Sequence, residues 1–337
     1  GRVISINRRY FRALILDRLC RYLRISVNKD AVVKALEFLI QRSGAKLIIT
    51  IGASPEISQS CHNLNLKHAE LLHSVGYSKI EWNWESREKE SLPTYILSMD
   101  PLSTKTFSGL CSKGVRVLEV PHPFIKRFFL SKYKKEIPQE WRPKDIRVSD
   151  KRRILICLQW GYSGELLQFD NILDNGLYPQ IFNDLFKLTL DEIEWCLRLH
   201  PVQITDSAYT SHREVVINLA TQFKNVSWES WTESPLPLLL PLADGCLSMS
   251  SMSSYDAAYF GIPSLLLCPM LRSGGCDEEW FEDLVEAGYA QKREATLTNL
   301  YEWAINVRKK EPYLCNITSD GAWELALEAL LESSVNR

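Results

Sequence analysis

Hydrophobic residues fall along this chain in two alternating patterns: short, near-continuous apolar runs and longer segments with helical spacing. A near-continuous run is typical of a strand in a parallel sheet covered on both faces, and helical spacing is typical of an amphipathic helix packed on such a sheet. The runs predict strands at 45–51, 94–99, 115–120, 154–160, 194–199, 225–228, 246–249 and 264–268. The helical spacing predicts helices at 30–42, 178–190, 207–223, 255–260, 279–287, 297–309 and 322–331. This alternation predicts an α/β fold, with 45–51 as a central parallel strand.

The segment 133–153 interrupts both patterns. It is rich in Lys, Glu, Pro and Arg and lacks apolar periodicity, which is typical of a linker between domains. A chain of 337 residues is also more typical of two domains than of one. We therefore expect an N-terminal α/β domain at 1–135, a linker at 136–152, a second α/β domain at 153–318 and a C-terminal helix at 319–337.

Composition and charge exclude several classes of protein. The net charge of −1, from 40 basic and 41 acidic residues, gives no electrostatic reason to expect a nucleic-acid partner. The nine cysteines form no C-x-x-C pair, so neither a disulfide framework nor a zinc site is predicted. The sequence shows no secretory signal and no apolar run long enough for a membrane span, and we expect a cytoplasmic protein. The first 25 residues contain seven arginines, which fits either a basic face that contacts the inner membrane or a partner domain, or a solvated amphipathic helix.

A serine-rich segment follows the predicted strand 246–249. Four serines lie within five positions, an acidic residue lies in the next predicted helix, and a Gly-x-Pro sequence precedes the strand 264–268. Because the first backbone N–H groups of a helix have no partner inside it, a strand that delivers hydroxyls to such an end forms a phosphate site. The alternative is that the serines only cap the helix and stabilise the turn. The predicted nucleotide-binding residues of this segment are Ser250, Ser251, Ser253, Ser254 and Asp256.

A second candidate group ends the predicted strand 194–199, in the sequence Arg198-Leu-His200-Pro201. A histidine at the carboxyl end of a parallel strand can donate to a phosphate or a ribose hydroxyl, and the proline fixes the turn that follows. Gln159 ends another predicted strand, ahead of a glycine-containing loop that either approaches the same ligand or forms a simple polar turn. We therefore add Gln159, Arg198, His200 and Pro201 to the predicted nucleotide site.

These features resemble the motifs of a known class of enzyme. The serine segment, with Asp256, Gly261 and Pro263, is similar to the last nucleotide-binding motif of two-domain GT-B glycosyltransferases, many of which have Glu where Asp256 stands. The His200-Pro201 pair together with the serines resembles the motifs of bacterial transferases that use CMP-activated sugars: sialyltransferases, polysialyltransferases and β-Kdo transferases. CDP-polyol phosphotransferases share a similar serine motif. The resemblance implies a GT-B-like α/β fold, two Rossmann-type domains facing an interdomain crevice, with His200 and the serines holding CMP.

Glu70 and His73 form the candidate catalytic group of the N-terminal half. The sequence Glu70-Leu-Leu-His73-Ser resembles the E-x-Q-H-G segment of Kdo-transferase-like and capsule enzymes, with Leu72 and Ser74 as departures. The alternative is that Glu70 and its neighbours are polar positions on an ordinary helix.

Glycosyl transfer requires a carboxylate that deprotonates the acceptor or attacks the anomeric carbon. The candidates are Glu70, Glu165 and Asp170, of which the last two follow the Gln159 loop. The sequence has no D-x-D, which agrees with the metal-independent habit of GT-B enzymes, so we expect no metal and no cofactor besides the nucleotide sugar. The Asp/Glu-Asp/Glu-Gly motif of sialyltransferases is also absent, which favours the Kdo type.

The sequence therefore predicts a cytoplasmic glycosyltransferase that moves an acidic sugar, Kdo, from a CMP-sugar to a growing surface glycan such as a lipopolysaccharide O-antigen or a capsule. The expected partners are the nucleotide-sugar donor and a glycan or lipid-linked glycan acceptor. Two alternatives stay open. One is a UDP-sugar-dependent transferase or epimerase of the same fold, and the other is a non-catalytic nucleotide-binding module of a larger polymerase.

Overall fold

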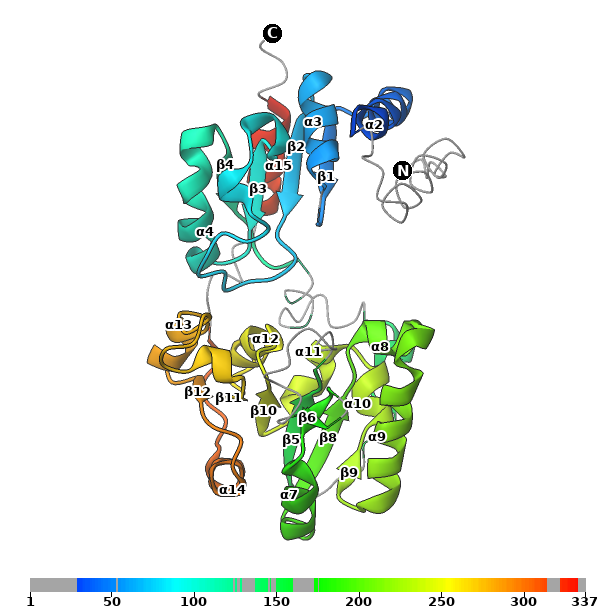
Figure 1. The fold of residues 1–337 in the computed structure, drawn as a ribbon, viewed down its shortest axis with the longest axis vertical. Helices are drawn as coiled ribbons and strands as arrows, with labels where there is room; N and C mark the ends of the chain where they lie inside the picture. Colours follow the sequence, from blue (N-terminus) through cyan, green and yellow to red (C-terminus); the bar gives the residue numbers. More distant parts are fainter. Residues whose placement is uncertain are drawn as a thin grey trace. The chain divides into compact units, whose positions relative to one another are not determined.

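The computed structural model describes residues 29–52, 54–123, 125, 128, 137–144, 146, 150–159, 173–174, 176–313 and 322–332. Contacts divide the chain into two compact units, Gly1–His122 with Thr318–Arg337 (unit 1) and Pro123–Ile317 (unit 2). Each unit is built around its own parallel sheet (Figure 1). The division falls after His122, ahead of the predicted linker 136–152, and joins the C-terminal segment to unit 1.

The described part of unit 1 contains a four-stranded parallel sheet in the order β1-β2-β3-β4. Its strands are β1 (Leu47–Thr50), β2 (Lys67–Leu71), β3 (Tyr95–Ser98) and β4 (Arg116–Glu119). Its helices are α2 (Lys29–Ser43), α3 (Pro55–Asn63), α4 (Pro101–Phe107) and α15 (Ala322–Glu332), with 3-10 turns η1 (Trp84–Ser86), η2 (Lys89–Ser91) and η3 (Ser108–Lys113). Trp323 of α15 donates from Nε1 to the carbonyl oxygen of Pro121 at 2.8 Å, so the C-terminal helix packs on this unit.

β1 differs from the prediction that 45–51 is a central strand. It is the outermost of the described strands in its sheet, and Ile49 and Ile51 are 45% and 63% exposed. An apolar run predicts a strand but not its neighbours, because strand order depends on pairing with distant segments. The segment around Glu70 is strand β2, so the alternative that it belongs to an ordinary helix is wrong.

The apolar pattern does not predict α3 and α4. α3 begins at Pro55 after Ser54, and α4 begins at Pro101 after Asp100, whose carboxylate accepts a hydrogen bond from the backbone N–H of Ser103 at 2.9 Å. Proline suits the first turn of a helix because its missing N–H would have no partner there. The Ser-Pro and Asp-Pro sequences are therefore the local features that mark these two helix starts.

Unit 2 contains, in its described part, a six-stranded parallel sheet in the order β12-β11-β10-β5-β8-β9. The strands are β5 (Arg152–Cys157), β8 (Ile193–Arg198), β9 (Val226–Ser227), β10 (Gly245–Ser248), β11 (Ser264–Leu266) and β12 (Ala290–Lys292). From β5 outward the chain adds strands first on one side and then on the other, which is the strand order of the Rossmann fold. The point where the direction reverses therefore lies between β5 and β10. A separate antiparallel pair joins β6 (Leu173–Asp174) to β7 (Tyr178–Pro179).

Short helices connect the strands of unit 2. They are α7 (Phe182–Leu188), α8 (Pro201–Thr205), α9 (Thr210–Gln222), α10 (Glu229–Glu233), α11 (Leu236–Leu239), α12 (Ser253–Tyr259), α13 (Glu282–Glu286) and α14 (Leu297–Asn306), with 3-10 turns η4 (Gln139–Trp141), η6 (Ser207–Tyr209), η7 (Leu240–Leu242) and η8 (Pro269–Leu271). The helix predicted at 178–190 begins only at Phe182, because Tyr178 and Pro179 pair in β7.

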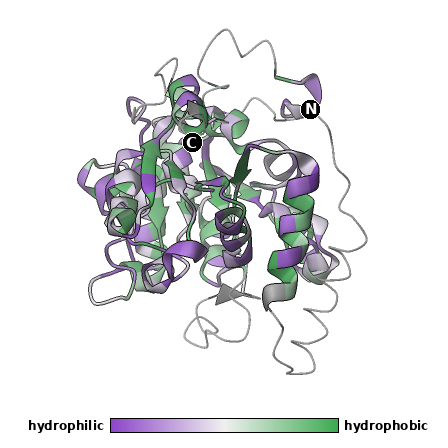
Figure 2. Ribbon diagram, turned by 90° about the horizontal axis from the view of Figure 1, so that it is seen from above, coloured by the Kyte–Doolittle hydropathy of each residue, from purple (hydrophilic) through white to green (hydrophobic). Residues whose placement is uncertain are grey.

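The core of unit 2 lies where helices cover the sheet around β5, β8 and β10. Buried side chains from the strands, from the helices and from the turn before β11 pack together: Leu155, Cys196, Trp231, Cys246, Ala257 and Ile262. Figure 2 shows hydrophilic and hydrophobic residues alternating along the helices, as amphipathic helices on a sheet require. Among the described residues, no helix has both the length and the apolar character of a membrane span.

Candidate functional site

The carboxyl ends of β5, β8 and β10 bring three predicted groups to one edge of the unit 2 sheet. β5 ends at Cys157, and in the sheet register this residue pairs with Arg198 at the end of β8 and with Ser248 at the end of β10. Gln159, His200 and the serine segment follow these strand ends directly. The edge includes the switch point between β5 and β10, where ligands of doubly wound sheets bind.

The serines after β10 form a turn held largely by its own hydroxyls. The Ser248 hydroxyl accepts from the backbone N–H of Ser251 at 3.2 Å, and the Ser251 hydroxyl accepts from the N–H and the hydroxyl of Ser253 at 3.2 and 2.8 Å. Ser250, Ser251 and Ser253 are half-buried, whereas Ser254 is fully buried. Ser251 therefore stabilises the turn, as the capping alternative expects, and the assignment of Ser250 and Ser253, which are half-buried near the start of α12, to a phosphate stays a prediction.

His200 is exposed and caps α8, which begins at Pro201. Its Nδ1 atom accepts from the backbone N–H of Val202 at 3.2 Å, so the neutral ring has its proton on Nε2. Partial desolvation of the ring and the charge of Arg198 lower the pKa of His200, which favours this neutral, donating form. A hydrogen-bond donor at this strand end is suited to a phosphate or hydroxyl ligand.

Gln203 is fully buried and ties α8 to the segment after β5. Its Oε1 atom accepts from the His200 N–H at 2.7 Å, and its Nε2 atom donates to the carbonyl oxygen of Gln159 at 3.1 Å. Nε2 also lies 2.8 Å from Nδ1 of His212. Gln203 is not among the residues predicted from the sequence, although its spacing from His200 is that of a capping box.

Arg198 serves the structure of the site. Its Nη1 atom donates to the carbonyl oxygens of Trp231 and Ser234 at 2.6 and 2.7 Å, at the end of α10. Carbonyls at a helix end have no partner inside the helix, so the guanidinium satisfies them. Arg198 therefore ties the end of β8 to α10, and its assignment to the nucleotide site stays a prediction.

Two groups beside Arg198 change charge near neutral pH. The sulfur of Cys157 lies 4.0 Å from that of Cys246, and the pKa of Cys157 is lowered to about 7 by that contact, by Ser253 and by the charge of Arg198, while burial opposes the change. Burial and Cys157 raise the pKa of Asp256 to about 7, with Arg198 acting in the opposite direction. Cys157 is not among the predicted site residues, because a cysteine within an apolar run is typical of an ordinary core residue.

Glu70 lies at the carboxyl end of the unit 1 sheet in a chain of hydrogen bonds. Its carboxylate is buried and accepts from the Thr50 hydroxyl and from the backbone N–H of Gly52. The Thr50 hydroxyl lies 2.6 Å from Nε2 of His68, and the Ser58 hydroxyl lies 3.1 Å from Nδ1 of the same ring. Burial lowers the pKa of His68 to about 4, so the ring is neutral. The network orients the Glu70 carboxylate. His68, Thr50 and Ser58 are not among the site residues predicted from the sequence.

His73 lies on the segment after β2 and is exposed. The Tyr77 hydroxyl lies 3.1 Å from its Nδ1 atom, so His73 pairs with Tyr77 while Glu70 contacts Thr50 and Gly52. The other two carboxylate candidates, Glu165 and Asp170, lie outside the described residues. Within the described ranges, no group of three or more His, Cys, Asp and Glu side chains is arranged to hold a metal ion.

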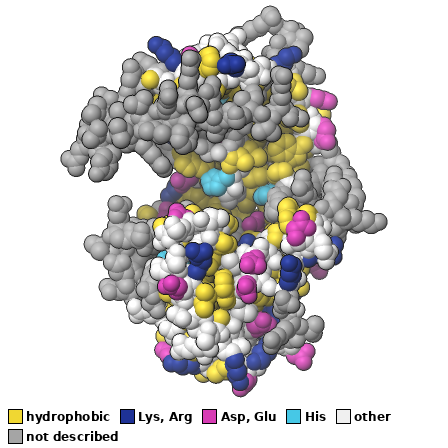
Figure 3. Space-filling view, turned by 90° about the vertical axis from the view of Figure 1, so that its right-hand side faces the viewer, with side chains coloured by type: hydrophobic (Ala, Val, Ile, Leu, Met, Phe, Trp, Pro, Cys, Tyr) yellow, Lys and Arg dark blue, Asp and Glu magenta, His cyan; other side chains and the backbone are white. Residues whose placement is uncertain are grey.

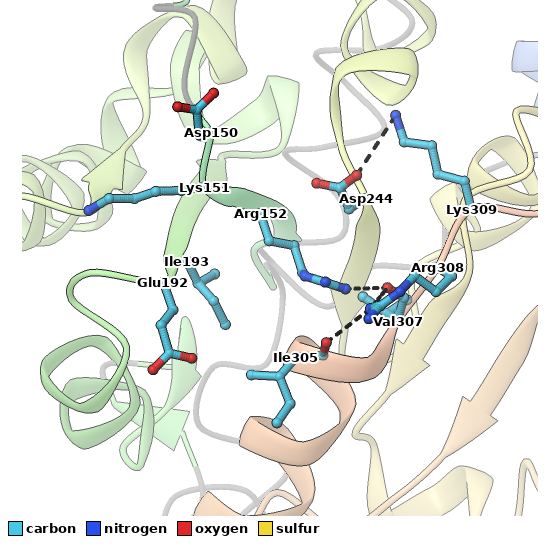
Figure 4. Close-up of a pocket in the computed structure, with 10 residues that line it drawn as sticks. All are labelled: Asp150, Lys151, Arg152, Glu192, Ile193, Asp244, Ile305, Val307, Arg308 and Lys309. Carbon is cyan, nitrogen blue, oxygen red and sulfur yellow. Dashed lines mark hydrogen bonds and ion pairs between the residues drawn. The ribbon is translucent and has the colours of Figure 1, made fainter.

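A pocket of about 560 Å³ lies at the opposite, amino edge of the unit 2 sheet (Figure 4). Arg152 and Arg308 both donate to the carbonyl oxygen of Val307, and Lys309 lies 4.0 Å from the carboxylate of Asp244. Arg152 and Arg308 thus contact a carbonyl at the end of α14, and Lys309 lies near the Asp244 carboxylate, which precedes β10. Because ligands of doubly wound sheets bind at the carboxyl edge, this pocket is separate from the predicted nucleotide site.

No known protein-family model matches the sequence, and no curated protein matches it. The fold is similar to solved structures of UDP-GlcNAc 2-epimerases. The enzyme from Methanocaldococcus jannaschii has a TM-score of 0.58 at 12% identity, over 90% of this chain and 82% of that one. The Neisseria meningitidis enzyme bound to UDP-GlcNAc has a TM-score of 0.58 at 15% identity, over 95% of this chain and 89% of that one. The complex of Staphylococcus aureus MnaA with UDP has a TM-score of 0.57 at 14% identity, over 95% of this chain and 87% of that one.

At these identities the likeness establishes the fold alone. The chain has a GT-B-type α/β fold with two Rossmann-like domains, so the fold class predicted from the sequence is confirmed.

Proposed function

We propose that this protein is a nucleotide-sugar enzyme that binds a uridine diphosphate sugar at the carboxyl edge of β5, β8 and β10. The observation that supports this best is the convergence of His200, the serine turn and the switch point of a Rossmann sheet. The similar structures from Neisseria meningitidis and Staphylococcus aureus contain UDP-GlcNAc and UDP, which favours a uridine nucleotide over the CMP-sugar expected from the motifs.

The site offers neutral hydrogen-bond donors to the phosphates. The Ser250 and Ser253 side chains follow β10, where the Ser253 hydroxyl and N–H donate to Ser251 within the turn, and the Nε2–H of His200 lies after the end of β8. Preorganised donors stabilise the charge that develops on a nucleotide leaving group. We expect no metal to be required for this, so a chelator should leave turnover unchanged.

Glu70 is the carboxylate that we assign to proton transfer. A UDP-sugar transferase needs a base for the acceptor hydroxyl, and an epimerase needs a base for a carbon-bound proton of the sugar. Glu70 is held by Thr50 and Gly52, which fixes its orientation as a catalytic carboxylate requires.

A CMP-sugar glycosyltransferase is the second candidate, favoured by the His200-Pro201 pair and the serine turn that resemble CMP-sugar enzymes. In that case the Kdo donor, the surface-glycan acceptor and the metal-free mechanism predicted from the sequence would apply. A cytoplasmic location with contact to the inner membrane stays a prediction for either candidate.

The test is a thermal-shift and calorimetric panel of UDP, CMP, GDP and ADP on the full chain. We expect UDP to bind most tightly, and a ligand at about a hundred times its Kd stabilises a protein by about 2.7 kcal/mol. Stabilisation by CMP and not by UDP would favour the second candidate. Binding of UDP without turnover of any UDP-sugar would favour a non-catalytic module, and the absence of any nucleotide binding would overturn the proposal.

A further inference from the structure

Trp82 is an exposed aromatic side chain on strained backbone. It is 39% exposed and has a φ angle of 58°, and Asn83 follows with a φ angle of 57°. Asparagine tolerates the left-handed region, but for a bulky residue such as tryptophan this conformation is a genuine outlier. Strain of this kind persists only where the surroundings impose it, and it gathers at functional sites.

Buried neighbours impose this conformation. The Phe107 ring stacks near the Trp82 indole, with centroids 6.2 Å apart and planes at 24°, and Tyr77 and Trp84 approach it at 5.5 and 5.2 Å. These three rings are nearly or fully buried. Arg87 donates from Nη2 to the carbonyl oxygen of Trp82 at 3.0 Å, which fixes the backbone as well. The indole is therefore held rigidly while a large part of it remains open to solvent.

His73 lies beside the exposed indole. The two ring centroids are 5.7 Å apart, and His73 is itself exposed. The segment that bears His73 is anchored, because Asp100 accepts from the Gly76 N–H at 3.0 Å and the Ser103 hydroxyl accepts from the Tyr77 N–H at 3.1 Å. A flat apolar surface and a group that can donate or accept a hydrogen bond thus occupy fixed, adjacent positions.

This pair follows the carboxyl end of β2, which ends at Leu71 in a fully parallel sheet. That edge is where open α/β sheets bind ligands. Figure 3 shows where hydrophobic and histidine side chains lie on one described face of the molecule. Trp82 is the aromatic member of the exposed large hydrophobic residues in the described ranges, which otherwise comprise isoleucines and leucines.

We propose that Trp82 and His73 form a carbohydrate-binding platform, in which the indole stacks on the C–H face of a pyranose ring and the imidazole hydrogen-bonds to a ring hydroxyl. The platform rests on the proposed function, since it gives a sugar-processing enzyme a subsite for the glycan rather than for the nucleotide. A pyranose fits because it presents a flat apolar face with hydroxyls at its rim, matching an indole with a polar neighbour. Aliphatic side chains such as Ile51 offer no such flat surface.

The test measures binding of the full chain to an array of immobilised mono- to hexasaccharides of common pyranoses. We expect binding to at least one glycan, a loss of about tenfold or more in Trp82→Ala, and retention of most affinity in Trp82→Tyr, which keeps an aromatic ring. His73→Ala, at an exposed position, should also weaken glycan binding. Ile51→Ala removes an even more exposed apolar side chain of unit 1 and should bind as the parent does.

Absence of glycan binding by the parent, or parental binding by both Trp82→Ala and His73→Ala, would overturn the platform. Calorimetry with UDP separates this outcome from the proposed function. We expect unchanged UDP affinity in Trp82→Ala; a matching loss of UDP affinity would mean that the indole stacks on the nucleobase and would overturn the assignment to a sugar. Failure of the parent to bind UDP would contradict the proposed function while leaving the glycan result readable.

Discussion

The Thr50 hydroxyl lies 2.6 Å from Nε2 of His68 and donates its proton to the carboxylate of Glu70. His68 and Glu70 both lie on β2. Since the Thr50 proton goes to Glu70, the His68 ring must donate from Nε2, and its Nδ1 atom accepts from Ser58 at 3.1 Å. One arrangement of protons thus satisfies the whole buried chain. Protonating His68 would require the Ser58 hydroxyl to turn and accept from Nδ1–H, so that it no longer donates to the ring.

The first prediction is a loss of unit 1 stability in mild acid. The pKa of His68 is about 4 in the folded protein, against about 6.5 in an unfolded chain. Between these pH values the unfolded chain binds the proton and the folded one does not, so the free energy of unfolding falls as the pH drops from 6.5 toward 4. The difference between the folded and unfolded pKa values corresponds to about 3 kcal/mol of unfolding free energy.

Urea unfolding between pH 4 and 7 checks this, with His68→Asn as the comparison. Burial also lowers the pKa of His122 to about 4, and the raised pKa of Asp256 in unit 2 acts in the opposite direction in this window. We therefore expect the difference in unfolding free energy between the parent and His68→Asn to shrink as the pH falls from 6.5 toward 4. An unchanged slope in His68→Asn would contradict the assignment of His68 as a buried neutral ring.

The second prediction concerns proton transfer by Glu70. Glu70→Gln removes the charge, yet the amide can donate to Thr50 if the rest of the hydrogen-bond chain reverses. We therefore expect a turnover loss of about a hundredfold or more per folded molecule with nucleotide affinity nearly unchanged. Thr50→Val is the control, since it breaks the network and costs about 1–3 kcal/mol of stability but keeps the carboxylate. Equal turnover in the two variants would exclude Glu70 as the base.

The third prediction separates two roles of His200. His200→Ala removes both the cap of α8 and the Nε2 donor, whereas His200→Asn keeps a capping acceptor and removes the imidazole. We expect both variants to lose about tenfold or more in UDP affinity, but only the alanine variant to lose about 1 kcal/mol of stability. Ser253→Ala should likewise weaken UDP binding. Calorimetric affinity at the parental level in His200→Asn would show that His200 acts only as a cap.

Local and nearly local features of this fold were predictable, whereas features set by distant contacts were not. The strands ending at Cys157, Arg198 and Ser248 were located from apolar runs alone, since a parallel strand covered on both faces needs such a run. The position of β1 as the outermost described strand of its sheet was not predictable, because Leu47–Thr50 has the same apolar character as a central strand. Pro55 and Pro101 marked helix starts that periodicity alone did not reveal.

The candidate site divides in the same way. His200 and the serines were selected because a strand end followed by a turn has a recognisable sequence, but Gln203 and His68 matter through partners outside their own elements. The motifs concern contacts to a phosphate rather than to a base, so they could not decide between CMP and UDP. Trp82 has no sequence signature, because its left-handed backbone is imposed by Phe107, Trp84 and Arg87.

The fourth prediction is that Asp256 destabilises unit 2 above neutral pH. Its pKa is about 7 in the folded protein and near 3.8 when exposed to solvent, so the folded state binds the extra proton between these values. The free energy of unfolding therefore falls as the pH rises from 4 to 7 and stays lower above that. Asp256→Asn should raise the melting temperature at pH 8 and change it little at pH 4. The exposed Asp184→Asn is the control, and a similar gain at pH 8 in that variant would point to net charge instead of burial.

The last prediction tests the turn that connects α12 to β11. Gly261 has a φ angle of 71°, and a Cβ atom there would lie 2.1 Å from the carbonyl oxygen of Lys310, with backbone on both sides of the clash. Gly274 has a similar φ angle of 82° but no atom within 4 Å of the added Cβ. Both alanine variants carry the left-handed strain of about 1 kcal/mol. The difference in stability between them therefore measures the cost of the clash with Lys310. We expect Gly261→Ala to unfold at clearly lower urea than Gly274→Ala and to lose UDP affinity, because α12 presents the serine turn. Equal urea midpoints in the two variants would mean that the backbone at Lys310 moves aside. The close approach at Gly261 would then not hold α12 in place.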